Sequence, residues 1–353
     1  MKRKCFLSFF ALMICTLGFA ASDADIALFN AVKAKNLNEV NRYIYANANQ
    51  RFEYGGGKVM TAFQLAVENN STQIARSLIV DGNADVNTDG KDEPPLFIAI
   101  RNDNSDLLQL IVSNGANVNA IYNDMTPLMY CYKISKGDYS RNADLLLKNL
   151  SDNFDWGHKD AEGNTVMHLA AMGGNAAIIS TLLNQNESRA SALLQAKNLQ
   201  GITPIGIYIF NARKANKISV GLLITFLNLT TATPLTIADF TLPVSAMTDN
   251  GIFTIGDMNI ADTTQKLKFF TILLKGNTNK MLASERDSLD VPLLCHAIEN
   301  EWEEKIVDLI IRRYGNGWEK IRTDGRRGEN AIDIMRRCHS EDKYQEIFDA
   351  YSN

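Results

Sequence analysis

Histidine and cysteine, the residues on which many catalytic and metal sites depend, are scarce in this sequence. The chain has 353 residues, of which 4 are histidine and 5 are cysteine. The histidines show no zinc-ligand spacing, either among themselves or with the cysteines. The serine-hydrolase motif G-x-S-x-G is also missing. These absences favour a protein that is not an enzyme and that uses no metal ion and no other cofactor.

The chain also lacks an excess of positive charge and, beyond its first residues, a long apolar run. Its formal net charge is −4. Binding to phosphate backbones needs clustered Lys and Arg, so nucleic acid is excluded as the main partner. No stretch after residue 21 is apolar over the roughly 20 residues that a membrane-spanning helix needs. We therefore expect no stable membrane insertion once the N-terminal segment is removed.

Residues 1–21 are predicted to be a cleaved secretory signal peptide. Lys2, Arg3 and Lys4 form a basic start, an apolar run occupies residues 6–19, and small residues follow. A basic start, a short apolar run and small residues are the parts of an export signal. The run is too short to cross a bilayer comfortably, and a signal anchor is the alternative. We expect an exported protein, either periplasmic or secreted.

What is present in abundance is a repeated pattern, clearest in residues 160–174, which read D-A-E-G-N-T-V-M-H-L-A-A-M-G-G. Gly163 suits a tight turn that requires a positive φ. Thr165 is a good residue for a helix N-terminus. Met167 and Ala170 then lie on one helical face, and Gly174 ends the helix. The pattern predicts a turn, a short helix, a glycine stop and a second helix.

Pairs of one larger inward residue and a second residue three positions later mark further copies of this pattern. Successive larger residues of the first four copies are 35, 33 and 32 positions apart, and the next two intervals are 39 and 38. The pairs are Leu28/Ala31, Phe63/Ala66, Leu96/Ala99, Leu128/Cys131, Met167/Ala170, Ile205/Tyr208 and Leu294/Ala297. A period near 33 residues is typical of a stacked array of helical repeats.

The repeated unit resembles the ankyrin repeat, whose core motif is T-P-L-H-x-A. Thr126-Pro127 and Thr203-Pro204 match the first two letters of that motif, and His168 matches its histidine. The resemblance implies that His168 bonds the backbone of a turn and is structural.

The resemblance implies an all-α fold, an ankyrin-repeat solenoid of about eight to nine helix-turn-helix repeats with extended fingers and one degenerate or inserted segment. It divides the chain into a signal peptide at 1–21, ankyrin repeats at 22–229, a degenerate repeat with an insertion at 230–281, and C-terminal repeats with a cap at 282–353. An array of this kind is elongated, because each repeat contacts only its neighbours.

A solenoid of this kind implies a non-enzymatic protein-protein interaction module, in this case outside the cytoplasm. The partner is expected to be another protein, bound along the concave face that the fingers and first helices form, and the chain itself is expected to be monomeric. Two alternatives remain open. One is an enzyme or ligand-binding protein with its site in the insertion at 230–265, and the other is a structural envelope component.

Five residues occupy finger positions in the repeat register and are predicted to contact the partner: Tyr122, Asp124, Trp156, His158 and Gln200. Aromatic side chains at such positions are good interface anchors. For Trp156 the alternative is that it packs onto its own long finger.

Overall fold

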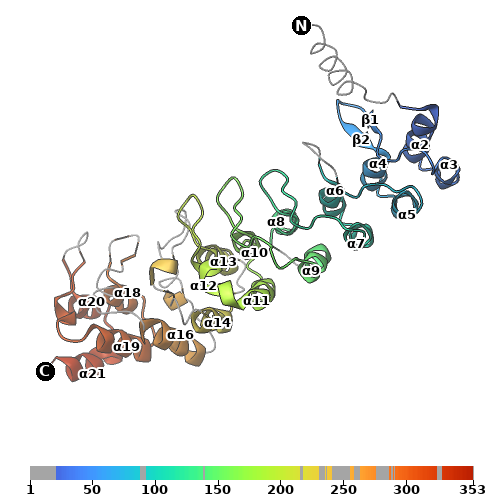
Figure 1. Ribbon diagram of the computed structural model, residues 1–353. Coiled ribbons are helices and arrows are strands. Elements are labelled where there is room, and N and C mark those ends of the chain that lie inside the picture. The colour runs from blue at the N-terminus through green and yellow to red at the C-terminus, as the bar shows by residue number, and fades with distance from the viewer. Residues whose placement is uncertain are drawn as a thin grey trace, which may run out of the picture. The chain divides into compact units, whose positions relative to one another are not determined.

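The computed structural model describes residues 21–87, 93–137, 140–214, 218–229, 235, 237–240, 255–257, 263–275, 286–287, 289, 291–323 and 328–352. Over these residues the chain is an all-α solenoid of repeats, each with an inner helix, a turn and an outer helix (Figure 1). The chain forms two compact units, the first of Met1–Tyr122 and Arg141–Asp152, the second of Asn123–Ser140 and Asn153–Asn353. The predicted signal peptide at 1–21 lies outside the described residues except for residue 21.

The first unit contains three inner helices and four outer helices within its described residues. The inner helices are α2 (Asp23–Lys33), α4 (Ala62–Glu68) and α6 (Pro95–Arg101). The outer helices are α3 (Leu37–Arg42), α5 (Thr72–Val80), α7 (Ser105–Ser113) and α9 (Arg141–Lys148). The finger before α4 is an antiparallel pair of β1 (Arg51–Glu53) and β2 (Val59–Thr61), with Phe52 opposite Met60. Neighbouring helices contact one another within each row.

The second unit has the same two rows of helices. Its inner helices are α8 (Pro127–Ile134), α10 (Val166–Ala171), α13 (Pro204–Lys214), α18 (Leu293–Glu299) and α20 (Ala331–Arg337), and the short η2 (Ile237–Phe240) contacts α13. Its outer helices are α11 (Ala176–Gln185), α14 (Val220–Leu229), α16 (Thr263–Lys275), α19 (Glu304–Tyr314) and α21 (Glu341–Tyr351). Three short helices, η1 (Glu187–Arg189), α12 (Ala190–Gln195) and η3 (Trp318–Lys320), lie in the connections.

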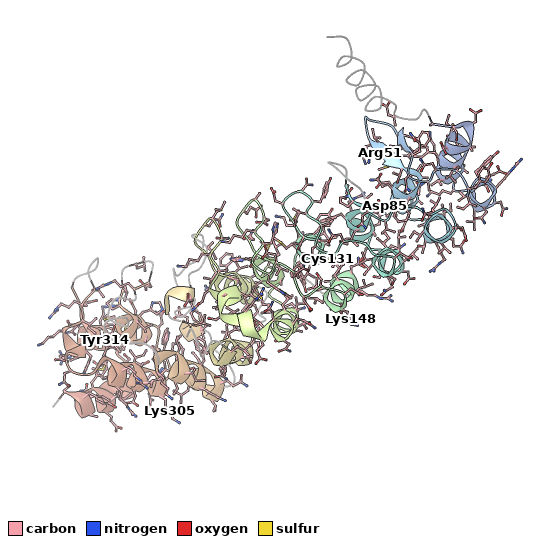
Figure 2. The ribbon with its side chains drawn as sticks, in the orientation of Figure 1. Arg51, Asp85, Cys131, Lys148, Lys305 and Tyr314 are labelled. Atoms are coloured by element: carbon pink, nitrogen blue, oxygen red, sulfur yellow. The ribbon has the colours of Figure 1, made fainter. Side chains whose placement is uncertain are left out.

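The core of each unit is built from the paired residues that the sequence pattern marks. Every member of those seven pairs is buried, with at most 7% of its surface exposed. Cys131 occupies the place of the usual alanine in α8 and is fully buried (Figure 2). Small residues at these positions let neighbouring inner helices approach closely, so burial of the larger residues holds one repeat on the next.

Seven of the inner helices, those whose following turn the structure describes, end in the same turn, in which one residue has a left-handed backbone. These residues are Lys35, Asn70, Asp103, Lys136, Gly174, Glu301 and His339, with φ between 51° and 64°. The left-handed residue reverses the chain so that the outer helix can pack back against the inner one. Only one of the seven is glycine, so most of these turns were invisible to a search for glycine stops.

Three fingers of the second unit, those before α10, α13 and α18, share one hydrogen-bond pattern. Asp160 Oδ1 accepts from the backbone N–H groups of Glu162 and Asn164 at 3.0 and 2.8 Å. Asn198 and Asp287 make the same pair of bonds to the residues two and four positions later. An Asx side chain that binds its own following backbone stabilises a tight turn. The solenoid architecture therefore continues to the repeat at α18.

An asparagine ladder joins consecutive repeats of the first unit at the ends of the outer helices. Asn49 Oδ1 accepts from Asp85 N–H at 2.7 Å, and Asn87 Oδ1 accepts from Asn117 N–H at 2.8 Å. Each amide also donates to a carbonyl of the next repeat, as Asn87 does to Gly115 at 3.0 Å. These asparagines thus satisfy backbone groups of the turns that follow the outer helices.

The degenerate repeat with an insertion that the sequence predicts at 230–281 falls largely outside the described residues. Within that span η2, residues 255–257 and α16 are described, and Phe240 and Ile255 are fully buried. The division of the chain at residues 229 and 281 stays a prediction. In the described part of the chain, no helix has both the length and the apolar character that membrane crossing requires.

Candidate functional site

One position on the inner helices, two residues after the second member of each pair, faces the fingers and changes its chemistry along the chain. It is occupied by Lys33, Glu68, Arg101, Lys133, Met172, Phe210 and Glu299, and by Arg337 in α20. Charged residues therefore occupy most of this series, and two apolar residues interrupt it at α10 and α13.

The charged members of the series are paired with one another or with the fingers. In the first unit, Arg101 Nη2 lies 2.7 Å from Glu68 Oε2, and its Nε lies 3.2 Å from Glu93 Oε1. In the second unit, Arg337 lies 3.2 Å from Glu299 and 3.1 Å from Glu329. Each arginine thus binds one glutamate of the preceding inner helix and one of its own finger.

A hollow of about 470 Å³ opens where the charged series is interrupted, and we call it the inner hollow. Met172, Ile207 and Phe210 line its apolar floor. Ile207 is buried, whereas Met172 and Phe210 are partly exposed. A concave apolar surface with a few polar groups is the usual form of a binding site, for which about 300–1,000 Å³ is typical.

The rim of the inner hollow carries polar side chains that make no side-chain hydrogen bond or ion pair with other described residues. Gln200, at the tip of a finger, and Asn211, on α13, line the hollow. Within the described part of the chain, neither side-chain amide makes a hydrogen bond. Glu162 lies at 3.3 Å from Lys133 Nζ, whereas Lys136 has no counter-ion among the described residues. The hollow therefore offers two amides and one ammonium group to a ligand.

Of the residues predicted to contact a partner, Gln200 lines the inner hollow and the others do not. Asp124 is exposed, and its carbonyl accepts a hydrogen bond from His158 Nε2 at 3.0 Å. This bond links two successive fingers of the second unit. Tyr122 belongs to the first unit and packs edge-on against Phe97, with 5.4 Å between ring centroids. The roles of these residues in binding stay predictions.

Trp156 packs onto its own finger, which was the alternative to an exposed anchor. Its side chain is only 8% exposed, and its ring lies edge-on against Phe154 at 5.0 Å. The hydrophobic effect favours this burial more than display of the indole at a finger tip. Trp156 is therefore part of the finger's support.

His168 holds successive fingers together. Its Nδ1 accepts from the N–H of Thr165 at 3.1 Å, and its Nε2 lies 3.1 Å from the carbonyl oxygen of Ile202. A backbone N–H only donates and a carbonyl only accepts, so the proton resides on Nε2. Burial lowers the pKa of His168 to about 4, which keeps the ring neutral. Both ring nitrogens are engaged, and the residue has a structural role.

The remaining motif residues also shape helix starts and turns. Thr126 Oγ1 accepts from Met129 N–H at 3.2 Å, and Pro127 is the first residue of α8. Thr203 Oγ1 accepts from Gly206 N–H at 3.1 Å just before Pro204 begins α13. Gly163 has φ 78°, and a Cβ there would lie 2.8 Å from the backbone N of Leu199.

A buried cluster around His296 went undetected by sequence reasoning. Its Nδ1 lies 2.7 Å from Asp287 Oδ2, and its Nε2 lies 2.8 Å from Asp257 Oδ1. The indole N–H of Trp302 donates to the same Asp257 oxygen at 2.8 Å, and Gly256 lies against that ring. Burial opposes a charge on the ring, but the bonds to Asp257 and Asp287 outweigh it and raise the pKa of His296 to about 9. The cluster is an ion clamp with Asp257 as its exposed member, and neither nitrogen of the His296 ring is left for a substrate.

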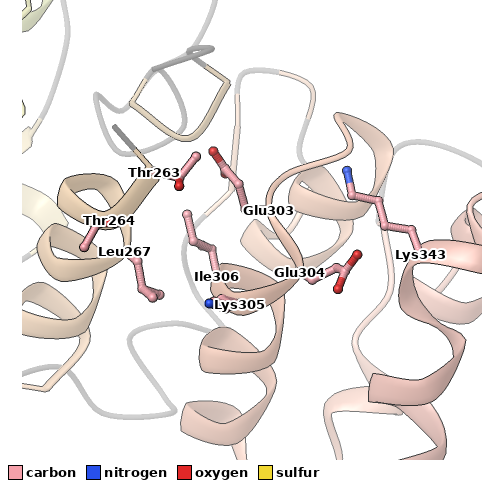
Figure 3. Close-up of a pocket in the computed structure, with 8 residues that line it drawn as sticks. All are labelled: Thr263, Thr264, Leu267, Glu303, Glu304, Lys305, Ile306 and Lys343. Atoms are coloured by element: carbon pink, nitrogen blue, oxygen red, sulfur yellow. The ribbon is translucent and has the colours of Figure 1, made fainter. Parts of the chain in front are cut away.

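A second hollow, of about 450 Å³, lies among the outer helices α16, α19 and α21 (Figure 3). Leu267 and Ile306 provide its apolar surface. Two of its four charged lining residues are already engaged, because Glu303 lies 2.8 Å from the buried Lys266 and Lys343 donates to a backbone carbonyl. Among the described residues no group of three His, Cys, Asp or Glu side chains could hold a metal ion. The inner hollow is therefore the better candidate for a binding site.

The signal for the inner hollow was present in the sequence but unused. Met172 and Phe210 stand in the inner-helix series where the other repeats have Lys, Arg or Glu. Adjacent, partly exposed apolar residues with a polar rim are the arrangement that marks an interaction surface, whereas single exposed apolar residues are common. Lys136 and Asn211 have no comparable signal, since their availability depends on contacts that the sequence does not reveal.

Comparison with known protein families identifies the repeats. The family model described as "Ankyrin repeats (3 copies)" matches residues 28–122 and 63–152. The model described as "Ankyrin repeat" matches residues 162–197. No match was found among curated proteins. These segments of the chain are ankyrin repeats, and ankyrin repeats are generally modules for protein-protein interaction and typically non-enzymatic.

Proposed function

We propose that this protein is an exported interaction module that binds another protein at the inner hollow. The observation that supports the proposal is the interruption of the charged inner-helix series. Elsewhere along the series, Arg101 and Arg337 are each occupied by two glutamates of the chain itself. Met172 and Phe210 cannot form ion pairs, and at these positions the surface is an apolar floor bordered by the amides of Gln200 and Asn211. An apolar centre surrounded by polar groups is the arrangement of a protein interface.

Site-specific photocrosslinking tests where the partner binds. A photoreactive amino acid at Gln200, on the rim, is expected to give a discrete adduct with a partner in extracts of the source cells. The matched control is Asn184, an exposed polar residue on the outer helix α11 of the same unit. Met172→Glu in the Gln200-labelled protein should remove the adduct, because it places a charge on the apolar floor. Equal adducts from both positions, or none from Gln200, would contradict the proposal.

The proposed export depends on residues 1–21 and can be tested by itself. Fused to a reporter enzyme that is active only outside the cytoplasm, these residues are expected to give activity and a product shortened by the length of the signal. Replacing Lys2, Arg3 and Lys4 with glutamate should reduce export, since a basic start orients the apolar run. An inactive, uncleaved fusion would place the protein inside the cell and leave the binding site unaffected.

A further inference from the structure

The inner hollow is lined by one cation, Lys136, and one anion, Glu162, in a chain whose formal net charge is −4. Lys133 and Glu162 form an ion pair at 3.3 Å and largely neutralise each other. Lys136 also lines the hollow, and its ammonium group has no partner among the described residues. Its backbone is fixed, because it is the left-handed residue that ends α8. The ligand that complements this charge carries a carboxylate.

The floor of the hollow selects for one large apolar group beside that carboxylate. Met172 and Phe210 come from successive inner helices, and Ile207 lies one turn before Phe210 on α13. Burial of an apolar side chain on such a surface favours binding, because it removes apolar area from water. Methionine and phenylalanine adapt to or stack on Leu, Met and aromatic side chains.

The two available amides select for an extended backbone. A carboxamide carries both a donor and an acceptor, as does each peptide group of a ligand. Gln200 projects from a finger and Asn211 from α13, so they belong to two different elements that border the hollow. In a helix the backbone groups are already bonded to one another, whereas an extended segment leaves them free to bond these amides.

We propose that the inner hollow binds an extended peptide segment that places a large apolar side chain on Met172, Ile207 and Phe210 and a carboxylate at Lys136. The carboxylate belongs either to an Asp or Glu side chain or to the C-terminus of the partner. This inference rests on the proposed function and specifies the partner that the same site recognises.

Selection from a random dodecapeptide library against the chain without residues 1–21 tests the inference. The enriched peptides are expected to share Leu, Met or an aromatic residue within a few positions of Asp, Glu or a free C-terminus. Fluorescence anisotropy should then show that the strongest peptide binds Lys136→Glu at least about tenfold more weakly than it binds the original protein. The reason is that the peptide carboxylate is attracted by Lys136 but repelled by a glutamate. The control, Lys148→Glu, makes the same charge change at an exposed position of α9 (Figure 2) and should leave binding unchanged.

Reversing the charge on both the peptide and residue 136 tests whether these two groups contact each other. A peptide with Lys in place of its acidic residue should bind Lys136→Glu better than it binds the original protein. Comparison of free and amidated C-termini separates the two sources of the carboxylate. No enriched family, or peptides that bind Lys136→Glu and the original protein equally, would overturn the inference. The crosslinking experiment at Gln200 tests the proposed function independently of the peptide selection. A folded partner protein could form that adduct even if no peptide were enriched.

Discussion

Replacement of His296 with alanine is expected to lower the free energy of unfolding of the second unit by about 3–5 kcal/mol. The imidazolium is the counter-ion of Asp287, whose side chain is only 6% exposed, and it also binds Asp257. Its removal leaves the buried carboxylate of Asp287 without a counter-ion, although the other oxygen keeps its two backbone N–H bonds. Urea denaturation measures the loss, and hydrogen exchange should place it in α18 and α19. His158→Ala, which removes a histidine with a single bond to a backbone carbonyl, should cost less than about 1 kcal/mol.

The pH dependence of stability distinguishes the ion clamp from simple packing. Because the folded pKa of His296 is raised from 6.5 to about 9, its contribution is complete below pH 6.5 and is lost as the pH rises through 9. The loss amounts to about 3 kcal/mol for a shift of this size. At the acidic end, burial opposes ionisation of Asp287, but the hydrogen bond from His296 prevails and lowers the pKa of Asp287. The stability that the Asp287 carboxylate contributes is therefore lost as the pH falls below 3.8. A His296→Ala variant that keeps the alkaline loss would show that another group causes it.

Gly137→Ala is expected to destabilise the second unit by about 3 kcal/mol or more. Gly137 has φ 76°, and a Cβ there would lie 2.3 Å from the backbone N of Gly173 and 2.7 Å from the carbonyl oxygen of Ala170. The left-handed backbone costs an alanine about 1–2 kcal/mol, and overpacking against a backbone that cannot move aside adds about 1–3 kcal/mol. Thermal denaturation and hydrogen exchange in α8 and α10 measure the effect.

Gly201→Ala is the matched control for that prediction. Gly201 also has φ 76°, but a Cβ there would meet nothing within 4 Å. This variant should therefore show only the backbone strain, about 1–2 kcal/mol. If the two alanine variants were equally stable, the close approach of the turn after α8 to the turn after α10 would not affect the free energy of unfolding.

The repeat architecture could be predicted because its determinants are local. Pairs such as Met167/Ala170 lie one helical turn apart, and the motif around Thr126 and Pro127 starts a helix with its own atoms. The inward pattern therefore predicted which residues are buried, down to Cys131 in place of alanine. The asparagine ladder of the first unit lies beyond such local reasoning, because it joins residues 30 or more positions apart.

The charged and polar contacts could not be predicted because their partners come from different repeats. Arg101 and Glu68 are 33 positions apart, and His296 and Asp257 are 39 apart. Nothing in the sequence distinguishes these partners from other charged residues at similar spacing. Trp156 was undecided for a related reason, since its burial depends on how its finger folds around Phe154. The inner hollow emerges only when contacts show which rim groups remain available.

The carboxylate of Asp287 both stabilises its own finger and binds a histidine of the following helix. This double role limits which repeats of the array could replace one another. One of its oxygens shapes its own finger, as Asn198 Oδ1 does two repeats earlier, and the other binds His296. A graft of the Asn198 finger onto the α18 repeat would reproduce the turn but leave the buried His296 with only one of its two carboxylates, Asp257. Repeats that share this turn are thus not interchangeable, and a consensus sequence averaged over the array would erase the clamp.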